Sequence, residues 1–561
     1  MSERKWWQEK VAYQIWPKSF YDTNGDGIGD LQGIIAKLDY LKELGVDIIW
    51  ISPCYPSPMA DQGYDIADYR DIHPDFGTMA DMDELLAEAK KRDMYIILDL
   101  VANHCSDEHE WFKKACQDPD GEYGKYFYIT DTPKDGSLPN NWRSIFGGSV
   151  WEPLPGHPEK MYLHTYVPKQ PDLNWENPKV RQELYDMINW WLDKGVAGFR
   201  LDAIINIKKT SIDKSYPSDR PDGLCNIRAT MLAEAVGIDD FLQELKRETF
   251  AKHDAFTVGE VFTSRPDALQ AFIGENGHFS TMFDFDELEY KTWRDVGYDA
   301  AAEYLWGEEY KQVVFHKQKQ LEGVGYVANI LENHDRPRAA THFLPKGNTS
   351  IAAKKLIGAQ NFMLRGIPFI YQGQEIGMVN TVIDSMDMVD DCQTKDNYKV
   401  CLSEGYTPEA ALAKAAVFSR DNARTPVQWS AEENAGFTTG TPWMKVNPTY
   451  KEINVADQEN DPDSVLNWYR SLTALRHDPK YKEAICFGDL IPYKEEQLNL
   501  MSYYRKTPEQ TLLVVSNYQP EPQDVELPGE AKAILLNNLK AYDLEGNILH
   551  MKGFQFVMLE L

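Results

Sequence analysis

Three acidic residues that lie far apart in the sequence each close a short segment with the composition of a β-strand. Asp202 ends the segment GFRLD, Glu260 ends VGE and Asp335 ends NHD. Two carboxyl groups about 5 to 5.5 Å apart can cleave a glycosidic bond with retention, one as nucleophile and one as acid and then base. We take Asp202 as the candidate nucleophile and Glu260 as the candidate acid and base.

Arg200 stands two residues before the candidate nucleophile, so both side chains point to the same face of a strand. We expect this guanidinium to lower the pKa of Asp202 and keep it ionised, as a nucleophile requires. Glu260 has the opposite task, because a general acid must hold a proton near neutral pH. Nearby carboxylates and partial burial are expected to favour its protonated form.

The elements that position these acids follow a repeating pattern of strand and helix. Segments rich in β-branched or aromatic residues alternate with segments of helical period. The segment 178–195 is typical of the helices, with one apolar face, a proline near its start and a glycine at its end. The pattern predicts an α/β fold, a (β/α)8 TIM barrel, with its chemistry at the carboxyl ends of the strands. The eight expected strands are 11–16, 46–52, 95–100, 198–201, 255–259, 281–285, 326–331 and 368–371.

Two regions break this rhythm. Residues 105–174 are rich in glycine, proline, aspartate and aromatic residues without a clear helical period, and they are too long for an ordinary connection. Beyond about residue 490, alternating segments lack intervening helices, which indicates an antiparallel β-sandwich. We therefore expect a barrel at 1–104 and 175–485, an inserted domain at 105–174 and a C-terminal sandwich domain at 486–561.

Taken together, the three acidic segments and the segments DLVANH (99–104) and GYD (63–65) resemble the signature of the α-amylase superfamily of glycoside hydrolases. The segments QPDLNW (170–175), GIPFIYQGQE (366–375) and SRDNARTPVQW (419–429) are similar to motifs of its oligo-1,6-glucosidase subfamily. That subfamily also holds α-1,4-glucosidases, dextran glucosidases, trehalose-6-phosphate hydrolases and sucrose isomerases. The resemblance runs from about Trp7 to the end of the chain.

The resemblance implies further residues around one bound sugar ring. Asp335 would be the third acid, hydrogen-bonding two hydroxyls of the distorted sugar with the help of His104 and His334. Arg424 would pair with Asp61 beneath the non-reducing end, with Arg420 as the second choice for that partner. Tyr64 would stack on the sugar ring, and Arg200 belongs to the same set of substrate-binding residues. Such a pocket is closed beyond the terminal glucose.

A polar loop near the N-terminus places oxygen ligands at alternate positions around a glycine turn, as calcium loops do. It departs from an EF-hand, because Gly33 stands where a bidentate glutamate is expected, and a turn stabilised by its own side chains is the alternative. The subfamily resemblance implies a structural Ca²⁺, with Mg²⁺ as the other possibility. The expected ligands are Asp22, Asn24, Asp26, the carbonyl of Ile28, and Asp30.

Composition narrows the partners and the compartment. The formal charge of −30 would repel nucleic acid and anionic lipid surfaces, so a neutral oligosaccharide is the expected partner. The sequence has no apolar run long enough to span a bilayer, and its start lacks the apolar core of a signal peptide. Seven scattered cysteines suit a reducing compartment. These features predict a cytoplasmic protein; its oligomeric state stays open, and a monomer is compatible with them.

We therefore expect an exo-acting, retaining α-glucosidase that releases glucose from short α-1,6- and α-1,4-linked oligosaccharides. Ala203, directly after the candidate nucleophile, favours activity on both linkages, because related α-1,6 enzymes commonly have valine there. The alternatives are a trehalose-6-phosphate hydrolase, which needs a basic pocket, and a sucrose isomerase. Basic residues near the site keep the first alternative open; they are Lys208, Lys209, Arg336 and Arg338. A non-catalytic, transporter-associated heavy chain of this fold is disfavoured, because all three acids are present.

Overall fold

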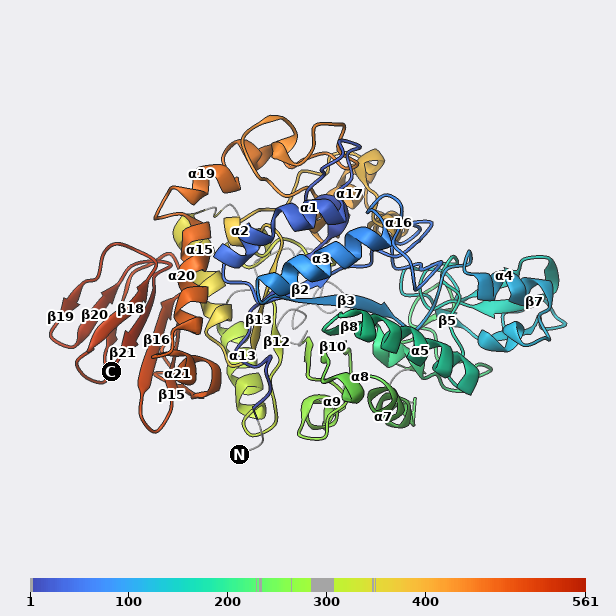
Figure 1. Ribbon diagram of the computed structural model, residues 1–561, viewed down its shortest axis with the longest axis horizontal. Helices are drawn as coiled ribbons and strands as arrows, with labels where there is room; N and C mark the ends of the chain where they lie inside the picture. The colour runs from blue at the N-terminus through green and yellow to red at the C-terminus, as the bar shows by residue number, and fades with distance from the viewer. Residues whose placement is uncertain are drawn as a thin grey trace.

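The computed structural model describes residues 4–228, 230–231, 235–263, 265–283, 307–345, 348 and 350–561. Eight parallel strands close a barrel at its centre, and their order around the barrel follows the sequence until the first strand pairs with the last (Figure 1). This confirms the predicted TIM barrel. The strands are β1 (Ala12–Ile15), β2 (Ile48–Ile51), β3 (Tyr95–Val101), β8 (Gly198–Asp202), β10 (Phe256–Glu260), β11 (Thr281–Phe283), β12 (Ala328–Asn329) and β13 (Ile367–Tyr371).

Helices surround the barrel and bury its outer face. The helix α5 (Pro178–Lys194) forms as its sequence predicts: the Asn177 side chain caps its first turn, and Gly195 ends it with a φ of 114°. Glycine adopts this left-handed conformation without the steric cost of a Cβ atom. The main surrounding helices are α1 (Leu31–Ala36), α2 (Leu38–Glu43), α3 (Met79–Lys91), α7 (Ile238–Glu248), α8 (Phe250–His253), α9 (Ala268–Ile273), α13 (Glu308–Gln320), α15 (Ile351–Phe362) and α20 (Val465–His477).

Strand register brings the chemical side chains to one end of the barrel. In the pairing of β3 with β8, Asp99 lies beside Arg200 and Val101 lies beside Asp202. Glu260 is the last residue of the neighbouring strand β10. Because parallel strands all point the same way, these carboxyl ends meet around one opening.

The segment between β3 and α5 forms its own small layer, which lies beside the barrel at the right of Figure 1. It contains α4 (Glu110–Gln117), which the sequence pattern did not predict, and an antiparallel sheet of β4 (Ile129–Asp131), β7 (His157–Leu163) and β6 (Trp151–Leu154). Its strand β5 (Trp142–Arg143) pairs with β9 (Cys225–Asn226), which comes from the loop after β8. The packed unit therefore includes a piece of chain outside 105–174, and those limits stay a prediction.

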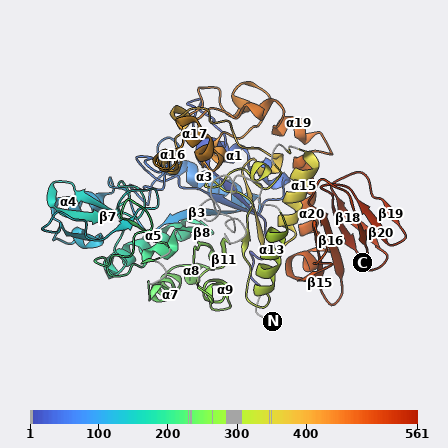
Figure 2. The ribbon, with the colours of Figure 1, turned by 180° about the vertical axis from the view of Figure 1, so that it is seen from behind.

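The C-terminal strands form two antiparallel sheets around a separate apolar core that includes Leu513, Val515 and Leu549. Seen from behind, they lie on the far side of α15 and α20 from the inserted segment (Figure 2). Among the described residues, none of the helices is long and apolar enough to cross a bilayer. One sheet is β14 (Asp489–Pro492), β15 (Leu500–Lys506), β16 (Thr511–Asn517), β21 (Phe556–Glu560) and β18 (Ala533–Asn537); the other is β17 (Gln523–Glu526), β20 (Ile548–Met551) and β19 (Leu544–Glu545).

Candidate functional site

One guanidinium holds three carboxylates at the carboxyl end of the barrel. Arg200 is fully buried, and its Nη1 lies 2.7 Å from Asp99 Oδ1 and 2.6 Å from Asp202 Oδ1. Its Nη2 forms an ion pair with Glu260 Oε1 at 2.8 Å. Neighbouring nitrogens of one guanidinium therefore hold Asp202 and Glu260 close together. Two neighbouring carboxyl groups are what a double-displacement reaction requires.

The backbone also positions Glu260. The N–H of Ala203 donates to Glu260 Oε2 at 2.8 Å. Ala203 reaches this position with a φ of 44°, a left-handed conformation that is uncommon for a residue with a side chain. The turn that follows the candidate nucleophile is therefore shaped to hold the candidate acid.

The expected low pKa of Asp202 is wrong. Burial raises the pKa of Asp202 well above its usual range; Arg200 opposes this shift, while the charges of Glu260 and Asp99 reinforce it. Asp202 is only 9% exposed and Glu260 only 8%. A single guanidinium cannot neutralise three carboxylates, so the cluster retains affinity for a proton.

Asp335 lies in the opposite electrostatic environment. Arg420 Nη1 and Arg424 Nη2 approach its Oδ1 at 3.3 and 3.0 Å, and His334 Nε2 lies 3.1 Å from its Oδ2. Burial alone would raise the pKa of Asp335, but His334 and the two arginines hold it well below its usual range. Asp335 is therefore an ionised acceptor, with the charge that a hydrogen-bond acceptor for sugar hydroxyls needs.

The partner of Asp61 is Arg420, and the expected pairing with Arg424 is wrong. Arg420 Nη2 lies 3.2 Å from Asp61 Oδ1, while its Nε donates to the buried Asp391 Oδ1 at 2.7 Å. Arg424 instead donates from Nε to the carbonyl of His334 at 3.0 Å. Both arginines are in the same sequence motif, and only the path of the α18 turn (Asp421–Arg424) decides which one reaches Asp61.

Tyr64 and the two histidines complete the lining of the site. The ring of Tyr64 stacks on His334 with centroids 5.3 Å apart, and its hydroxyl lies 2.7 Å from His334 Nε2. His104 Nε2 lies 3.1 Å from the carbonyl of Tyr64 and 3.1 Å from Gln170 Nε2. Gln170 also donates to Asp61 Oδ2 at 3.2 Å, so the inserted segment contributes directly to the pocket.

Sequence reasoning missed Asp99, Asp391 and the role of Lys209. Asp99 could have been found, because it is a charged residue inside the otherwise apolar strand YIILDLV. The Lys209 ammonium is buried between Asp172 Oδ2 at 2.9 Å and Asn103 Oδ1 at 3.0 Å, and so ties the loop after β8 to the inserted segment. Asp391 had no local signal, because its contact with Arg420 is purely tertiary.

Most of the basic residues that a phosphate pocket would need are already in ion pairs. Lys208 pairs with Glu176, Lys209 pairs with Asp172, and the buried Arg338 pairs with Glu332 at 3.0 Å. These pairs leave little positive charge for a phosphate group among them.

The predicted metal loop is organised by its own hydrogen bonds. Asp22 accepts four of them, from the N–H groups of Asn24, Gly25 and Gly27 and from the hydroxyl of Thr438. In the same loop the side-chain oxygens of Asn24 and Asp26 accept the N–H two residues further on, and Asp30 caps α1 through Gly33. Within the described part of the chain, no three histidine, cysteine, aspartate or glutamate side chains form a metal-binding group. The loop thus matches the alternative of a self-stabilised turn, and metal binding stays a prediction.

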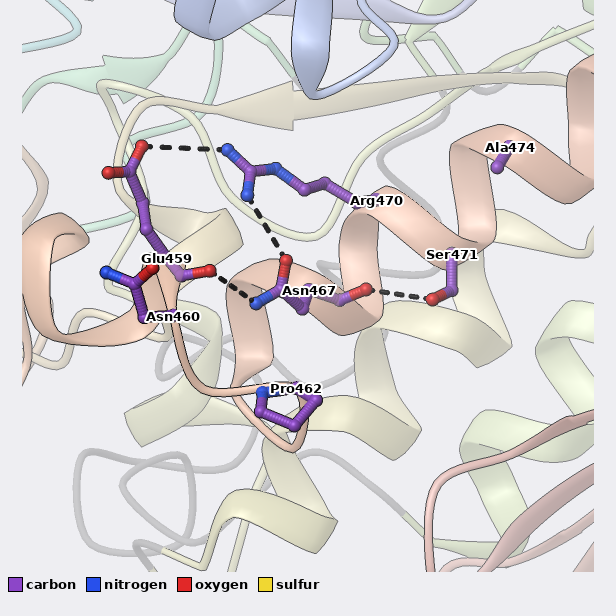
Figure 3. A pocket seen from close by; sticks show the side chains of 7 residues that line it. All are labelled: Glu459, Asn460, Pro462, Asn467, Arg470, Ser471 and Ala474. Atoms are coloured by element: carbon purple, nitrogen blue, oxygen red, sulfur yellow. Dashed lines mark hydrogen bonds and ion pairs between the residues drawn. The ribbon is translucent and has the colours of Figure 1, made fainter.

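A shallow depression lies away from this site, between α19 (Val455–Glu459) and α20 (Figure 3). Within it, Arg470 contacts Asn467 and Glu459 at 3.2 and 3.7 Å. Its lining shares no residue with the candidate site at the carboxyl end of the barrel. The lining residues are Glu459, Asn460, Pro462, Asn467, Arg470, Ser471 and Ala474.

Comparison with known proteins agrees with this geometry. The model of the alpha amylase catalytic domain matches residues 14–484, and that of the alpha-amylase SusG C-terminal domain matches residues 500–557. An oligo-1,6-glucosidase of Parageobacillus thermoglucosidasius is 42% identical over 552 residues, which cover 97% of this chain and 96% of the relative.

Two solved structures are similar over the whole chain. Isomaltulose synthase from Erwinia rhapontici NX5 has a TM-score of 0.93 and 38% identity, with 100% of both chains covered. Trehalose-6-phosphate hydrolase from Bacillus licheniformis has a TM-score of 0.90 and 36% identity, with 99% of this chain and 100% of that chain covered.

Proposed function

Because the chain belongs to the alpha-amylase family, glycoside hydrolase family 13, we propose that it is an exo-acting, retaining α-glucosidase. Its substrates are short α-1,6- and α-1,4-linked gluco-oligosaccharides, from which it releases glucose at the non-reducing end. Similarity to an oligo-1,6-glucosidase, at 42% identity over nearly the full chain, supports this assignment.

The observation that carries the proposal is the shared contact of Asp202 and Glu260 with Arg200. The mechanism requires that the proton retained by the carboxylate cluster resides on Glu260, which leaves Asp202 ionised. Asp202 then attacks the anomeric carbon and Glu260 donates its proton to the leaving oxygen, so that a covalent glucosyl ester forms and the leaving sugar departs. Glu260 then removes a proton from water, and the water oxygen displaces Asp202. Asp335 binds hydroxyls of the sugar as positive charge develops on the ring.

Exo action is supported by the other end of the site. Arg420 joins the buried Asp61 and Asp391 and the partly exposed Asp335 in one cluster of charges. We infer that this cluster occupies the space where a longer glucan would have to continue beyond the terminal glucose. The pocket therefore receives one sugar at its closed end and leaves the reducing side open.

The two alternatives of the same family are a sucrose isomerase and a trehalose-6-phosphate hydrolase, which are represented among the similar structures. The ion pairs of Lys208, Lys209 and Arg338 disfavour phosphate recognition. Incubation with isomaltose, maltose, sucrose, trehalose and trehalose 6-phosphate separates the three functions. We expect glucose from isomaltose and maltose; isomaltulose from sucrose, or selective cleavage of trehalose 6-phosphate, would contradict the proposal.

We also propose that the loop at 22–30 binds Ca²⁺, with Mg²⁺ as the alternative. Asn24 and Asp26 are exposed hard oxygen donors, whereas Asp22 would have to give up the hydroxyl of Thr438. We expect the wild type to melt at a higher temperature in Ca²⁺ than in EDTA. Asp26→Ala should lose this difference, and the exposed control Asp68→Ala should keep it. Equal melting of the wild type in Ca²⁺ and EDTA would refute metal binding.

A cytoplasmic location is a further proposal. All seven cysteines of the chain are described and are free thiols, and five of them are buried. Such thiols persist in a reducing compartment. Fractionation of the source cells, with activity in the soluble lysate and not in the medium, is the corresponding test.

A further inference from the structure

Three arginines gather where the barrel meets the C-terminal strands. Arg476 on α20 and Arg505 on β15 are fully buried, and Arg365 lies just before β13 and is partly buried. Within the described chain, none of the three forms an ion pair with a carboxylate, although the protein carries a net charge of −30. Arg470, which does pair with Glu459, shows how an arginine of the same helix is ordinarily neutralised. Buried guanidinium groups without a counter-charge are costly and demand an explanation.

Most of the donors in this group have no acceptor. Arg505 Nη2 donates to the carbonyl of Ile485 at 2.6 Å, but its Nε and Nη1 have no hydrogen-bond partner among the described residues. The same is true of Nε and Nη1 of Arg476 and of the buried hydroxyl of Tyr503. A buried polar group without a partner costs about 1 to 3 kcal/mol. The unpartnered arginine nitrogens here are all donors, and the Tyr503 hydroxyl can donate as well. A group dominated by donors calls for an acceptor that the protein itself does not supply.

The contacts of these side chains converge on one place. Arg476 Nη2 donates to the carbonyl of Gly366 at 3.0 Å, and Gly366 follows Arg365 directly. The Arg365 guanidinium lies 4.9 Å from the ring centre of Tyr326. Tyr503 and Arg505 are two residues apart on β15, so their side chains share a face of the strand.

The other side of the group is closed by the end of α21 (Lys482–Phe487). The ring of Phe487 lies 6.4 Å from that of Tyr326, and Arg505 is bonded to Ile485 in the same helix. Burial lowers the pKa of Arg505 to about 10; the charges of Arg365 and Arg476 add to this shift, and Tyr503 and Cys486 oppose it.

We propose that a small inorganic anion, best fitted by chloride, binds among Arg476, Arg505 and the hydroxyl of Tyr503. Arg365 supplies a third positive charge nearby. A small anion fits because the contributing side chains of Arg476, Arg505 and Tyr503 are fully buried, which excludes a sugar phosphate or another large organic anion. The anion would accept hydrogen bonds from all three side chains and join the barrel to the C-terminal strands.

This site lies at the opposite end of the barrel from the carboxylates. Tyr326 and Arg365 precede β12 and β13, whereas Asp202 and Glu260 are the last residues of their strands. The anion therefore stabilises the folded protein without taking part in catalysis. The inference does not depend on the proposed substrate.

The test is thermal unfolding of the full chain in sodium chloride and in sodium gluconate at equal ionic strength and pH. Gluconate is too large for a fully buried site, so the wild type should melt at a higher temperature in chloride, and the difference should grow with chloride concentration. Arg505→Met should abolish the difference, and Tyr503→Phe, which keeps the charges, should require more chloride for the same shift. Arg70→Met, which changes an exposed arginine, should respond as the wild type does.

Diffraction from crystals soaked in bromide locates the anion and covers the case in which Arg505→Met fails to fold. An anomalous peak within hydrogen-bonding distance of Arg476 and Arg505 is the expected result. An equal response of the wild type and Tyr503→Phe to chloride, or a water without anomalous signal at this position, would overturn the proposal. Stabilisation by sulfate but not by chloride would overturn the choice of a halide.

Discussion

Asp61 is held by Arg420 through a contact of 3.2 Å between Oδ1 and Nη2, and the same guanidinium reaches Asp335 Oδ1 through Nη1 at 3.3 Å. Two acids from opposite parts of the chain are thereby fixed to one side of the candidate sugar site. The Nε of the same guanidinium donates to Asp391 Oδ1 at 2.7 Å. The closed end of the pocket thus depends on an arginine that contacts three carboxylates and the Cys392 thiol.

This closed end predicts the products from a long substrate. Maltoheptaose should lose one glucose at a time, so that glucose and maltohexaose are the first products in a chromatographic time course. Arg420→Met should reduce kcat/KM strongly, because it leaves Asp61 and Asp391 without their shared cation. Early maltotriose or maltotetraose from the wild type would mean that the pocket is open at this end.

The contact of Arg200 with Asp202 and Glu260 predicts different losses for the two acids. Asp202→Asn should lower activity by about 10³-fold or more on every substrate, because no covalent intermediate can form. Glu260→Gln should lower isomaltose hydrolysis similarly but spare the first-turnover burst of p-nitrophenol from its α-glucoside, since that leaving group needs little protonation. Circular dichroism checks that the variant is folded. Loss of the burst in Glu260→Gln would argue against an acid role.

Asp65 makes stability depend on pH between about 4 and 6. It is fully buried and accepts hydrogen bonds from Ser57 Oγ and from the N–H groups of Ala60 and Asp61. Burial raises the pKa of Asp65 from 3.8 to about 6 in spite of those bonds. The folded state therefore binds this proton more tightly than the unfolded state, and the resulting stability is complete below pH 4 and is lost as the pH rises through 6.

The free energy of unfolding of the wild type, relative to Asp65→Asn, should therefore fall by about 1 to 3 kcal/mol from pH 4 to pH 6. Urea unfolding at several pH values measures this difference. The exposed control Asp68→Asn should show none of it. If the difference in unfolding free energy between the wild type and Asp65→Asn rises with pH instead, Asp65 is ionised in the folded protein over this whole pH range.

Linkage preference should depend on Ala203. Valine in its place would narrow the leaving-group side, and such a change is worth about 1 to 3 kcal/mol in discrimination. Ala203→Val should therefore lower kcat/KM on maltose more than on isomaltose by about 10- to 200-fold. The φ of 44° adds a backbone cost for a β-branched residue. Only the ratio of kcat/KM on maltose to kcat/KM on isomaltose is therefore diagnostic. Ala203→Gly, which tolerates this conformation, should keep both activities; an equal loss on both substrates in the valine variant would contradict the idea.

The barrel could be predicted from sequence because its strands are short and mostly apolar, and because glycine and proline mark helix ends such as those of α5. The acids could be found because they stand where those strands end. The helix α4 was missed, because it is only eight residues long and stands in a region rich in glycine, proline and aspartate, where no helical period extends over several turns.

Contacts that several distant segments share could not be predicted from the sequence. The pKa of Asp202 was placed in the wrong direction, because the spacing shows Arg200 beside it but not that Asp99 and Glu260 share the same guanidinium. The partner of Asp61 was misassigned for the same reason, since Arg420 and Arg424 are equivalent until the turn between them is folded. The sequence position of Lys209, just after a barrel strand, is typical of a solvent-facing lysine, but its side chain is buried in an ion pair with Asp172.

The central claim is that Asp202 and Glu260, held by one guanidinium, carry out a double displacement. Proton NMR of the glucose first released from p-nitrophenyl α-glucoside, recorded before mutarotation, tests it most directly. The account predicts α-glucose, because two inversions at the anomeric carbon restore its configuration. Initial release of β-glucose would mean a single inversion by water and would contradict the role of Asp202 as nucleophile.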